Sequence, residues 1–161
     1  ITLTEEGFER AQLVVRRHRL AECMLVEIMG LDWVDAYQEA HLMEHAISNV
    51  TEPLIVKLLN DPVVSPFGYP IPGSAVDEKL SMRRLIDLDE GQQGKIDRVF
   101  EEEEGVLNFY NKYNLKPGVI VKIIHVEHAD GEVDTITVVI GDQPQEVTLG
   151  KRQSSKIWMV E

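Results

Sequence analysis

The sequence has 161 residues, a hydrophobic fraction of 43% and a formal net charge of −12, from 16 basic and 28 acidic side chains. This length and apolar content suit one packed domain or two small ones. The acidic balance argues against nucleic-acid binding through this surface, since such binding normally needs basic patches. The single cysteine, Cys23, excludes an intramolecular disulfide and favours a reducing, cytoplasmic compartment. No apolar run approaches the ~20 residues of a membrane span, so no membrane partner is expected.

The alternating stretch from Ile1 to Thr4 predicts a strand at the start of the chain. Its partner strand would have to come from outside the sequence, which favours a fragment or a processed product. Thr4 can then cap a first helix, whose apolar stripe recurs with helical spacing until Gly30 ends it. Asp32 can cap a second helix of about sixteen residues.

A third helix is expected to begin at Asn49 or Thr51, with Pro53 near its first turn. Its apolar side chains, which we expect to be buried, are Leu54, Ile55, Leu58 and Leu59.

Residues 61–82 hold four of the seven prolines, which excludes a helix or a central strand and predicts an extended linker. After Met82 the hydrophobic pattern changes to period two. Strands are expected at residues 85–88, 94–99, 119–126, 135–140, 146–149 and 157–160, with a short helix over 103–113. Such short strands within about 80 residues suggest a small barrel. The predicted fold class is therefore α + β, with three helices followed by a β-barrel.

The second predicted helix contains the pattern His41-x-x-Glu44-His45, whose three side chains share one helical face and can reach one cation. The first helix carries His18 and Glu22 one turn apart, inside its apolar stripe. Two imidazoles and a carboxylate form a credible site for a divalent metal. The His18–Glu22 pair could complete that site or form a second one.

Two other interpretations of these residues stay open. A helical His–Glu pair is commonly a surface or a satisfied core feature, although two pairs on successive helices weigh against this, since burial without a partner is costly. The pattern His-x-x-Glu-His is also the inverted zinc-protease motif, with Glu44 as general base. The small bundle offers no convincing third ligand or cleft for a hydrolase. The run Arg16-Arg17-His18-Arg19 is interpreted as a solvated face.

Five segments recur in the same order in a known family: residues 3–7 (LTEEG), 16–22 (RRHRLAE), 30–32 (GLD), 39–45 (EAHLMEH) and 65–73 (SPFGYPIPG). They closely resemble the diphtheria-toxin-repressor family of iron- or manganese-dependent transcriptional regulators. The resemblance is strong over residues 1–73. It is weaker but consistent over residues 83–161, which look like the family's SH3-like (FeoA-type) domain.

The resemblance implies four parts: the end of a winged-helix wing (1–6), a helical dimerisation and metal-binding domain (7–60), a Pro-rich linker (61–82) and an SH3-like domain (83–161). Because the resemblance begins at the wing, we expect the family's N-terminal winged helix-turn-helix to lie outside this sequence. A homodimer is expected, which would bind operator DNA through that missing domain. The linker is expected to dock on the SH3-like barrel or to act as a mere spacer. Neither an enzymatic activity nor a small-molecule substrate is expected.

The resemblance also implies two metal sites. His41, Glu44 and His45 match the family's primary site, which side chains of the missing N-terminal helix complete in relatives. His18 and Glu22 match an ancillary site of iron-type members, and the position of His18 belongs to a coupled two-metal site in manganese-type members.

In some relatives the SH3-like domain adds a carboxylate to the ancillary site, and Glu103 is its best match within residues 101–104. Iron-type members usually carry Cys at the position of His41 and His at that of Tyr37, whereas manganese-type members carry Glu and Tyr. Tyr37 thus leans to manganese, and His41 fits neither pattern. A thiol-free site suits Mn²⁺ or Fe²⁺. A metal-dependent repressor is therefore predicted, with a metal-free structural dimer or partner-binding module as the alternative.

Overall fold

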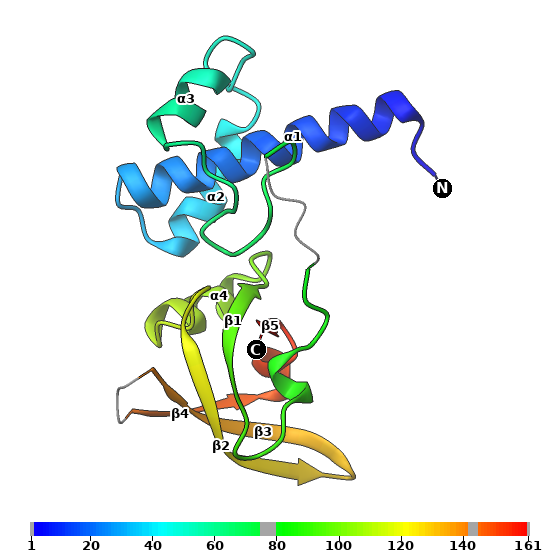
Figure 1. The fold of residues 1–161 in the computed structure, drawn as a ribbon, viewed down its shortest axis with the longest axis vertical. Helices are drawn as coiled ribbons and strands as arrows, with labels where there is room; N and C mark the ends of the chain where they lie inside the picture. Colours follow the sequence, from blue (N-terminus) through cyan, green and yellow to red (C-terminus); the bar gives the residue numbers. More distant parts are fainter. Residues whose placement is uncertain (1, 75–79, 142–144, 161) are drawn as a thin grey trace. The chain divides into compact units, whose positions relative to one another are not determined.

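The computed structural model describes residues 2–74, 80–141 and 145–160, and the chain divides into two compact units (Figure 1). The helical unit spans residues 1–78 and the sheet unit spans residues 79–161. The boundary lies inside the stretch that composition predicts to be a linker.

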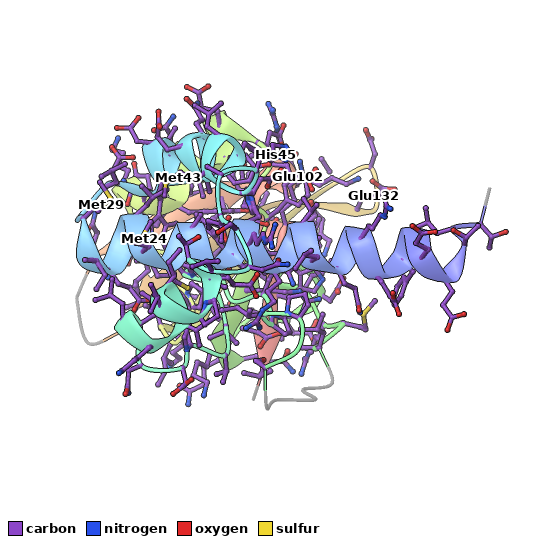
Figure 2. The ribbon with its side chains drawn as sticks, turned by 90° about the horizontal axis from the view of Figure 1, so that it is seen from above. Met24, Met29, Met43, His45, Glu102 and Glu132 are labelled. Atoms are coloured by element: carbon purple, nitrogen blue, oxygen red, sulfur yellow. The ribbon has the colours of Figure 1, made fainter. Side chains whose placement is uncertain are left out.

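The first helix, α1 (Glu5–Cys23), begins at Thr4, whose hydroxyl accepts a hydrogen bond from the Gly7 amide at 3.1 Å. The strand expected at the start is not formed by residues 2–4, because Thr4 leads straight into the helix, and Ile1 lies outside the described residues. A π-helical turn, η1 (Met24–Ile28), continues α1, and Gly30 ends it with a φ of 72°. Figure 2 shows Met24 and Met29 at this end of the long helix.

Two shorter helices pack beside the C-terminal half of α1, while its N-terminal half projects beyond them (Figure 1). Asp32 caps α2 (Trp33–Met43), which has eleven residues and is shorter than expected. Helix α3 (Glu52–Leu58) follows. The predicted burial of its apolar residues is wrong for Leu54 and Leu58, which are 64% and 59% exposed.

Small side chains let α1 and α2 approach closely. Ala21 of α1 packs with Ala36 and Ala40 of α2 in a buried cluster that also contains Leu25 and Ile47. Since the separation of packed helices depends on the side chains at their contact, alanines permit a short one. This approach brings the polar side chains of the two helices within reach of one another.

The Pro-rich segment, residues 62–74, packs on α1 as part of the helical unit. Phe67 is fully buried against Trp33, with ring centroids 4.9 Å apart. Ile71 joins a second core cluster with Leu20 and Cys23 of α1. The cysteine is buried, as expected of a small core residue. This stretch thus differs from the extended linker that its prolines predict.

Arginines of α1 hold the same segment through its backbone. Arg16 donates a hydrogen bond to the Pro72 carbonyl at 2.7 Å, and Arg19 donates one to the Pro70 carbonyl. The Arg19 guanidinium also lies over the ring of Tyr69, 5.2 Å from its centroid. The interpretation of the arginine run as a solvated face is therefore wrong.

The sheet unit contains one five-stranded antiparallel sheet in the order β4-β3-β2-β1-β5. Its elements, in chain order, are η2 (Leu85–Asp87), β1 (Gln93–Val99), α4 (Glu104–Lys112), β2 (Ile120–Ala129), β3 (Glu132–Ile140), β4 (Glu146–Gly150), α5 (Lys151–Ser154) and β5 (Ile157–Val160). Five of the six expected strands and the expected helix are confirmed. The strand expected at 85–88 is instead a 3-10 turn, because the Asp87 carboxylate accepts a hydrogen bond from the Arg84 amide at 2.9 Å. The α + β class with an SH3-like domain is confirmed.

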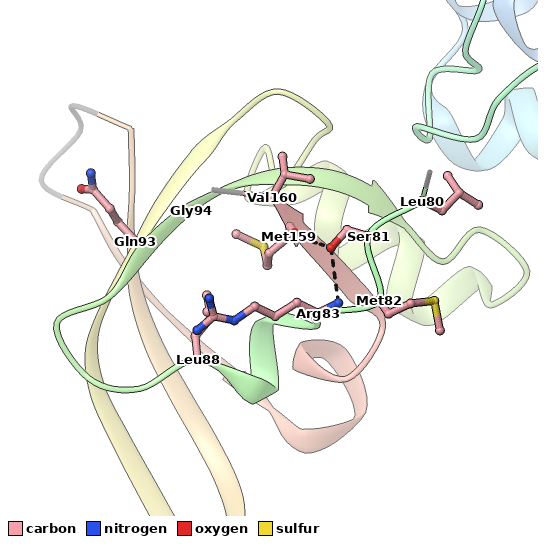
Figure 3. Close-up of a pocket in the computed structure, with 9 residues that line it drawn as sticks. All are labelled: Leu80, Ser81, Met82, Arg83, Leu88, Gln93, Gly94, Met159 and Val160. Atoms are coloured by element: carbon pink, nitrogen blue, oxygen red, sulfur yellow. Dashed lines mark hydrogen bonds between the residues drawn. The ribbon is translucent and has the colours of Figure 1, made fainter. Parts of the chain in front are cut away.

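The segment that enters the sheet unit runs beside β5 and is held there by Arg98. This buried arginine donates to the Ser81 carbonyl at 2.7 Å and lies over the Trp158 ring at 4.6 Å. The segment and β5 border a groove of about 480 Å³ (Figure 3). Within the described residues, no helix is long and apolar enough to cross a membrane.

Removing the Phe67 ring should destabilise the helical unit. We expect Phe67→Ala to lower the free energy of unfolding by about 3–5 kcal/mol, since loss of the buried ring leaves a cavity beside Trp33 and Tyr37 of α2. Met82→Ala is the control, because Met82 is 80% exposed and its loss should cost little. Urea unfolding of the two variants measures the difference, and equal midpoints would mean that the segment does not contribute to the core.

Candidate metal centre

Three side chains from two helices converge at the centre of the helical unit. His18 comes from α1, His41 from the last turn of α2, and Glu44 from the residue that caps α2. One ligand atom from each lies within 4.8 Å of the other two. The shortest contact joins His18 Nδ1 to Glu44 Oε2 at 2.8 Å. Nitrogen and carboxylate ligands in this arrangement can hold a divalent cation.

Glu22 lies one turn after His18 and is fully buried. Its Oε1 is 3.0 Å from His18 Nε2, yet neither carboxylate oxygen has an aligned hydrogen bond within the part of the chain that the structure describes. A buried carboxylate without hydrogen bonds is costly unless a cation compensates it. This buried carboxylate beside His18 is therefore an observation that fits positive charge at this place, either on the imidazole or on a bound cation.

His18 lies between the two carboxylates, and this placement determines its proton affinity. Burial alone would lower the pKa of His18, but ion pairs with Glu22 and Glu44 outweigh it and raise that pKa above the ordinary 6.5. Without a metal, the site thus stabilises a protonated imidazole. A bound cation would take the place of that proton.

The motif His41-x-x-Glu44-His45 lies across the end of α2. The helix ends at Met43, Glu44 caps it with helical backbone angles, and His45 lies in the following turn (Figure 2 labels Met43 and His45). His41 Nδ1 is 3.9 Å from Glu44 Oε2, and His45 Nε2 is 3.3 Å from Glu44 Oε1. The side chains of His41 and His45 are 52% and 74% exposed.

Glu44 consequently joins the two sites that the sequence suggests separately. Its Oε2 faces His18 and His41, while its Oε1 faces His45. Sequence spacing could not reveal this link, because His18 and Glu44 lie 26 positions apart on different helices.

Tyr37 forms one wall of the cluster. Its ring packs edge-on against the rings of His18 and His41, with centroid distances of 5.7 and 4.8 Å. The ring also approaches Phe67 at 6.4 Å. Sequence reasoning treated this tyrosine as an indicator of metal preference and missed its contact with the Pro-rich segment.

Glu103 lies in the sheet unit at the start of α4. Its carboxylate forms ion pairs with Arg152 and Lys156, and these hydrogen bonds lower the pKa of Glu103 below its usual range. The carboxylate is thus engaged within its own unit. Its contribution to a metal site stays a prediction.

A salt-bridge network links α3 to α1 next to the cluster. No pattern in the sequence predicts it. Glu52 accepts hydrogen bonds from Arg16 at 2.6 Å and from Arg17 at 3.1 Å. Burial acts to raise the pKa of Glu52, but these two hydrogen bonds outweigh it and lower that pKa. The network ties α3 to the turn of α1 that carries His18.

A protein family matches this part of the chain. The family described as "Iron dependent repressor, metal binding and dimerisation domain" matches residues 4–73, which contain the whole cluster. Residues 4–73 are thus similar to the metal-binding and dimerisation domain of iron-dependent repressors. This match confirms the resemblance inferred from the sequence motifs.

Individual relatives agree with this match. The "Iron-dependent repressor IdeR" of Mycobacterium tuberculosis is 36% identical over 140 residues, which are 85% of this chain and 53% of that protein. The "Diphtheria toxin repressor" of Corynebacterium diphtheriae is 45% identical over 73 residues, or 45% of this chain and 32% of that protein. A solved "Manganese-dependent transcriptional repressor complex with manganese" superimposes with a TM-score of 0.86 at 29% identity, covering 99% of this chain and 74% of that one. The chain thus spans about half the length of the curated relatives.

The raised pKa of His18 gives the metal-free protein a defined pH dependence. Because the folded pKa lies above the unfolded value of about 6.5, the stabilisation is complete below pH 6.5 and is lost as the pH rises through the folded pKa. We expect the NMR titration of the His18 ring to move to lower pH in Glu44→Gln. Glu39→Gln, at an exposed carboxylate of α2, should leave it unchanged. An unshifted His18 titration in Glu44→Gln would contradict the ion pair.

Proposed function

We propose that this chain is the metal-sensing and dimerisation part of a cytoplasmic, metal-dependent transcriptional repressor. The observation that carries this proposal is the convergence of His18, His41 and Glu44 beside the buried carboxylate of Glu22. The names of the relatives, which are iron- or manganese-dependent repressors, support it.

Mn²⁺ or Fe²⁺ is the proposed cation. The cluster offers imidazole and carboxylate groups and no thiolate, because Cys23 contacts the Val64 carbonyl and burial raises the pKa of its thiol to about 12. When bound, the cation supplies a double positive charge between the carboxylates. His18, His41 and Glu44 would hold it, and Glu22 would accept the proton on the other nitrogen of the His18 ring. His45, beside the second oxygen of Glu44, lies at the exposed edge of this group.

Metal sensing follows if the two helices hold the cation better in one conformation than in another. Glu44 and His41 come from α2 and its cap, while His18 and Glu22 come from α1, so shared ligation would fix the two helices against each other. Such a preference is what allows a ligand to shift a conformational equilibrium. In the whole protein, a metal-fixed homodimer would hold two DNA-reading elements at the spacing of a two-fold operator.

Two alternatives receive less support. A zinc hydrolase would need Glu44 free as a general base, whereas its Oε2 already contacts His18 at 2.8 Å. In a metal-free structural module, a protonated His18 would be the cation that compensates the buried carboxylate of Glu22. The placement of His41 beside Glu44 would then have no role.

Metal binding should stabilise the chain through the cluster. At a hundredfold excess over the dissociation constant, Mn²⁺ should add ~2.7 kcal/mol to the free energy of unfolding. Glu44→Gln should remove most of this gain, since Glu44 joins both histidine groups. His125→Ala, at an exposed histidine of β2, is the control and should keep it. Thermal unfolding with and without Mn²⁺ tests this, and equal gains in both variants would exclude the assigned site.

The helical unit should also form a homodimer through its exposed apolar side chains. Leu42, Val50, Leu54 and Leu58 are each more than half exposed, and such patches mark interaction surfaces. We expect sedimentation at micromolar concentration to show a dimer. Leu54→Glu should weaken it at least about tenfold, since burying a charge costs more than 1.4 kcal/mol, whereas Met82→Glu should not. A strict monomer would contradict the proposed dimerisation.

A further inference from the structure

The wall of the metal cluster is also the surface on which the Pro-rich segment packs. Tyr37 contacts the rings of both histidines on one side and the ring of Phe67 on the other. Phe67 is fully buried and packs in turn on Trp33. The aromatic rings thus form a continuous series from the ligands to residues 62–74.

A cation at the cluster would limit where the His41 ring can lie. His18 Nδ1 is 2.8 Å from Glu44 Oε2, and His41 Nδ1 is 3.9 Å from the same oxygen. Shared ligation of one cation would hold the His41 ring beside Glu44, and the Tyr37 ring packs edge-on against that ring.

The Pro-rich segment lies on the helices through buried apolar side chains and through polar contacts of its backbone. Phe67 and Ile71 are buried, and Arg16 and Cys23 donate to the Pro72 and Val64 carbonyls. Its own backbone is closed by hydrogen bonds from the Ser65 amide to the Tyr69 carbonyl at 2.8 Å and from the Ile71 amide to the Val63 carbonyl at 2.8 Å. These amides exchange with solvent only when the segment opens.

We propose that Tyr37 is a positioning residue that couples occupancy of the metal cluster to the docking of residues 62–74 on α1. Ligation of His41 fixes the Tyr37 ring in its contact with Phe67 and so favours the docked state of the segment. By linkage, the docked segment raises metal affinity by the same factor. The inference rests on the proposed function, because it requires metal at the cluster.

Hydrogen exchange read by mass spectrometry on the full chain tests the coupling, with Mn²⁺ as the probe. Mn²⁺ should slow exchange in peptides that contain Ser65 and Ile71 by about fivefold or more, the lower end of typical coupling between sites. Tyr37→Leu, which removes the ring, should reduce this effect below twofold while Mn²⁺ still raises the melting temperature. Tyr37→Phe keeps the ring and should preserve the effect. Tyr113→Leu, a matched loss of a ring in the sheet unit, should also preserve it.

The possible outcomes distinguish a failure of the proposed coupling from a failure of the proposed function. If Mn²⁺ stabilises the wild-type chain but leaves exchange in residues 62–74 unchanged, or if Tyr37→Leu keeps the full effect, the coupling is overturned and the metal site stands. If Mn²⁺ neither binds nor stabilises the wild-type chain, the proposed function fails and this inference fails with it. If Tyr37→Leu does not fold, Phe67→Leu, which interrupts the same series of rings, replaces it with the same expected loss.

Discussion

The contact between His18 and Glu44 is the interaction on which the helical unit depends. It joins α1 to the end of α2 at 2.8 Å across a packing surface of alanines. A bulkier side chain at Ala21 or Ala40 would separate the helices, and the imidazole and the carboxylate would no longer meet. The close apolar packing is therefore what makes the polar cluster possible, since the imidazole and the carboxylate meet only where the two helices approach closely.

Burial makes this contact sensitive to the cation that occupies it. His18 and Glu22 are buried, and Glu44 is nearly so, which means that water compensates their charges poorly. The cluster needs positive charge, and a proton on His18 or a divalent cation can provide it. A proton places one positive charge on the His18 imidazole between the two carboxylates. A divalent cation would in addition be ligated by His41. The two occupants would thus make different contacts with the end of α2, which is what a sensor requires.

Local patterns in the sequence predicted most of the secondary structure but little of how distant segments meet. Period-two alternation placed β1 and β2, and Thr4 and Asp32 correctly marked the starts of α1 and α2. The strand expected at 85–88 failed because Asp87 folds back onto Arg84, a side-chain contact that competes with the extended backbone.

The candidate ligands could be identified because histidine and glutamate recur one helical turn apart on two successive helices. Burial of such a pair without a partner costs free energy, and His18 and Glu22 interrupt an apolar stripe. That Glu44 unites them could not be predicted, because it depends on how closely two helices pack.

The Pro-rich segment shows most directly why composition alone misled. Proline and glycine exclude regular helix and central strand, but they do not exclude packing. A chain without regular hydrogen bonding can be buried if its carbonyls find other donors. Here Arg16 and Arg19 supply those donors to Pro72 and Pro70, one helical turn apart on α1.

Helix α1 therefore presents two functional faces. One carries the candidate ligands His18 and Glu22, and the adjacent face carries the arginines that hold residues 62–74. Because both faces belong to one helix, a shift of its backbone would move His18 and the neighbouring arginines together. The candidate metal cluster therefore lies one helix face away from the segment that these arginines hold.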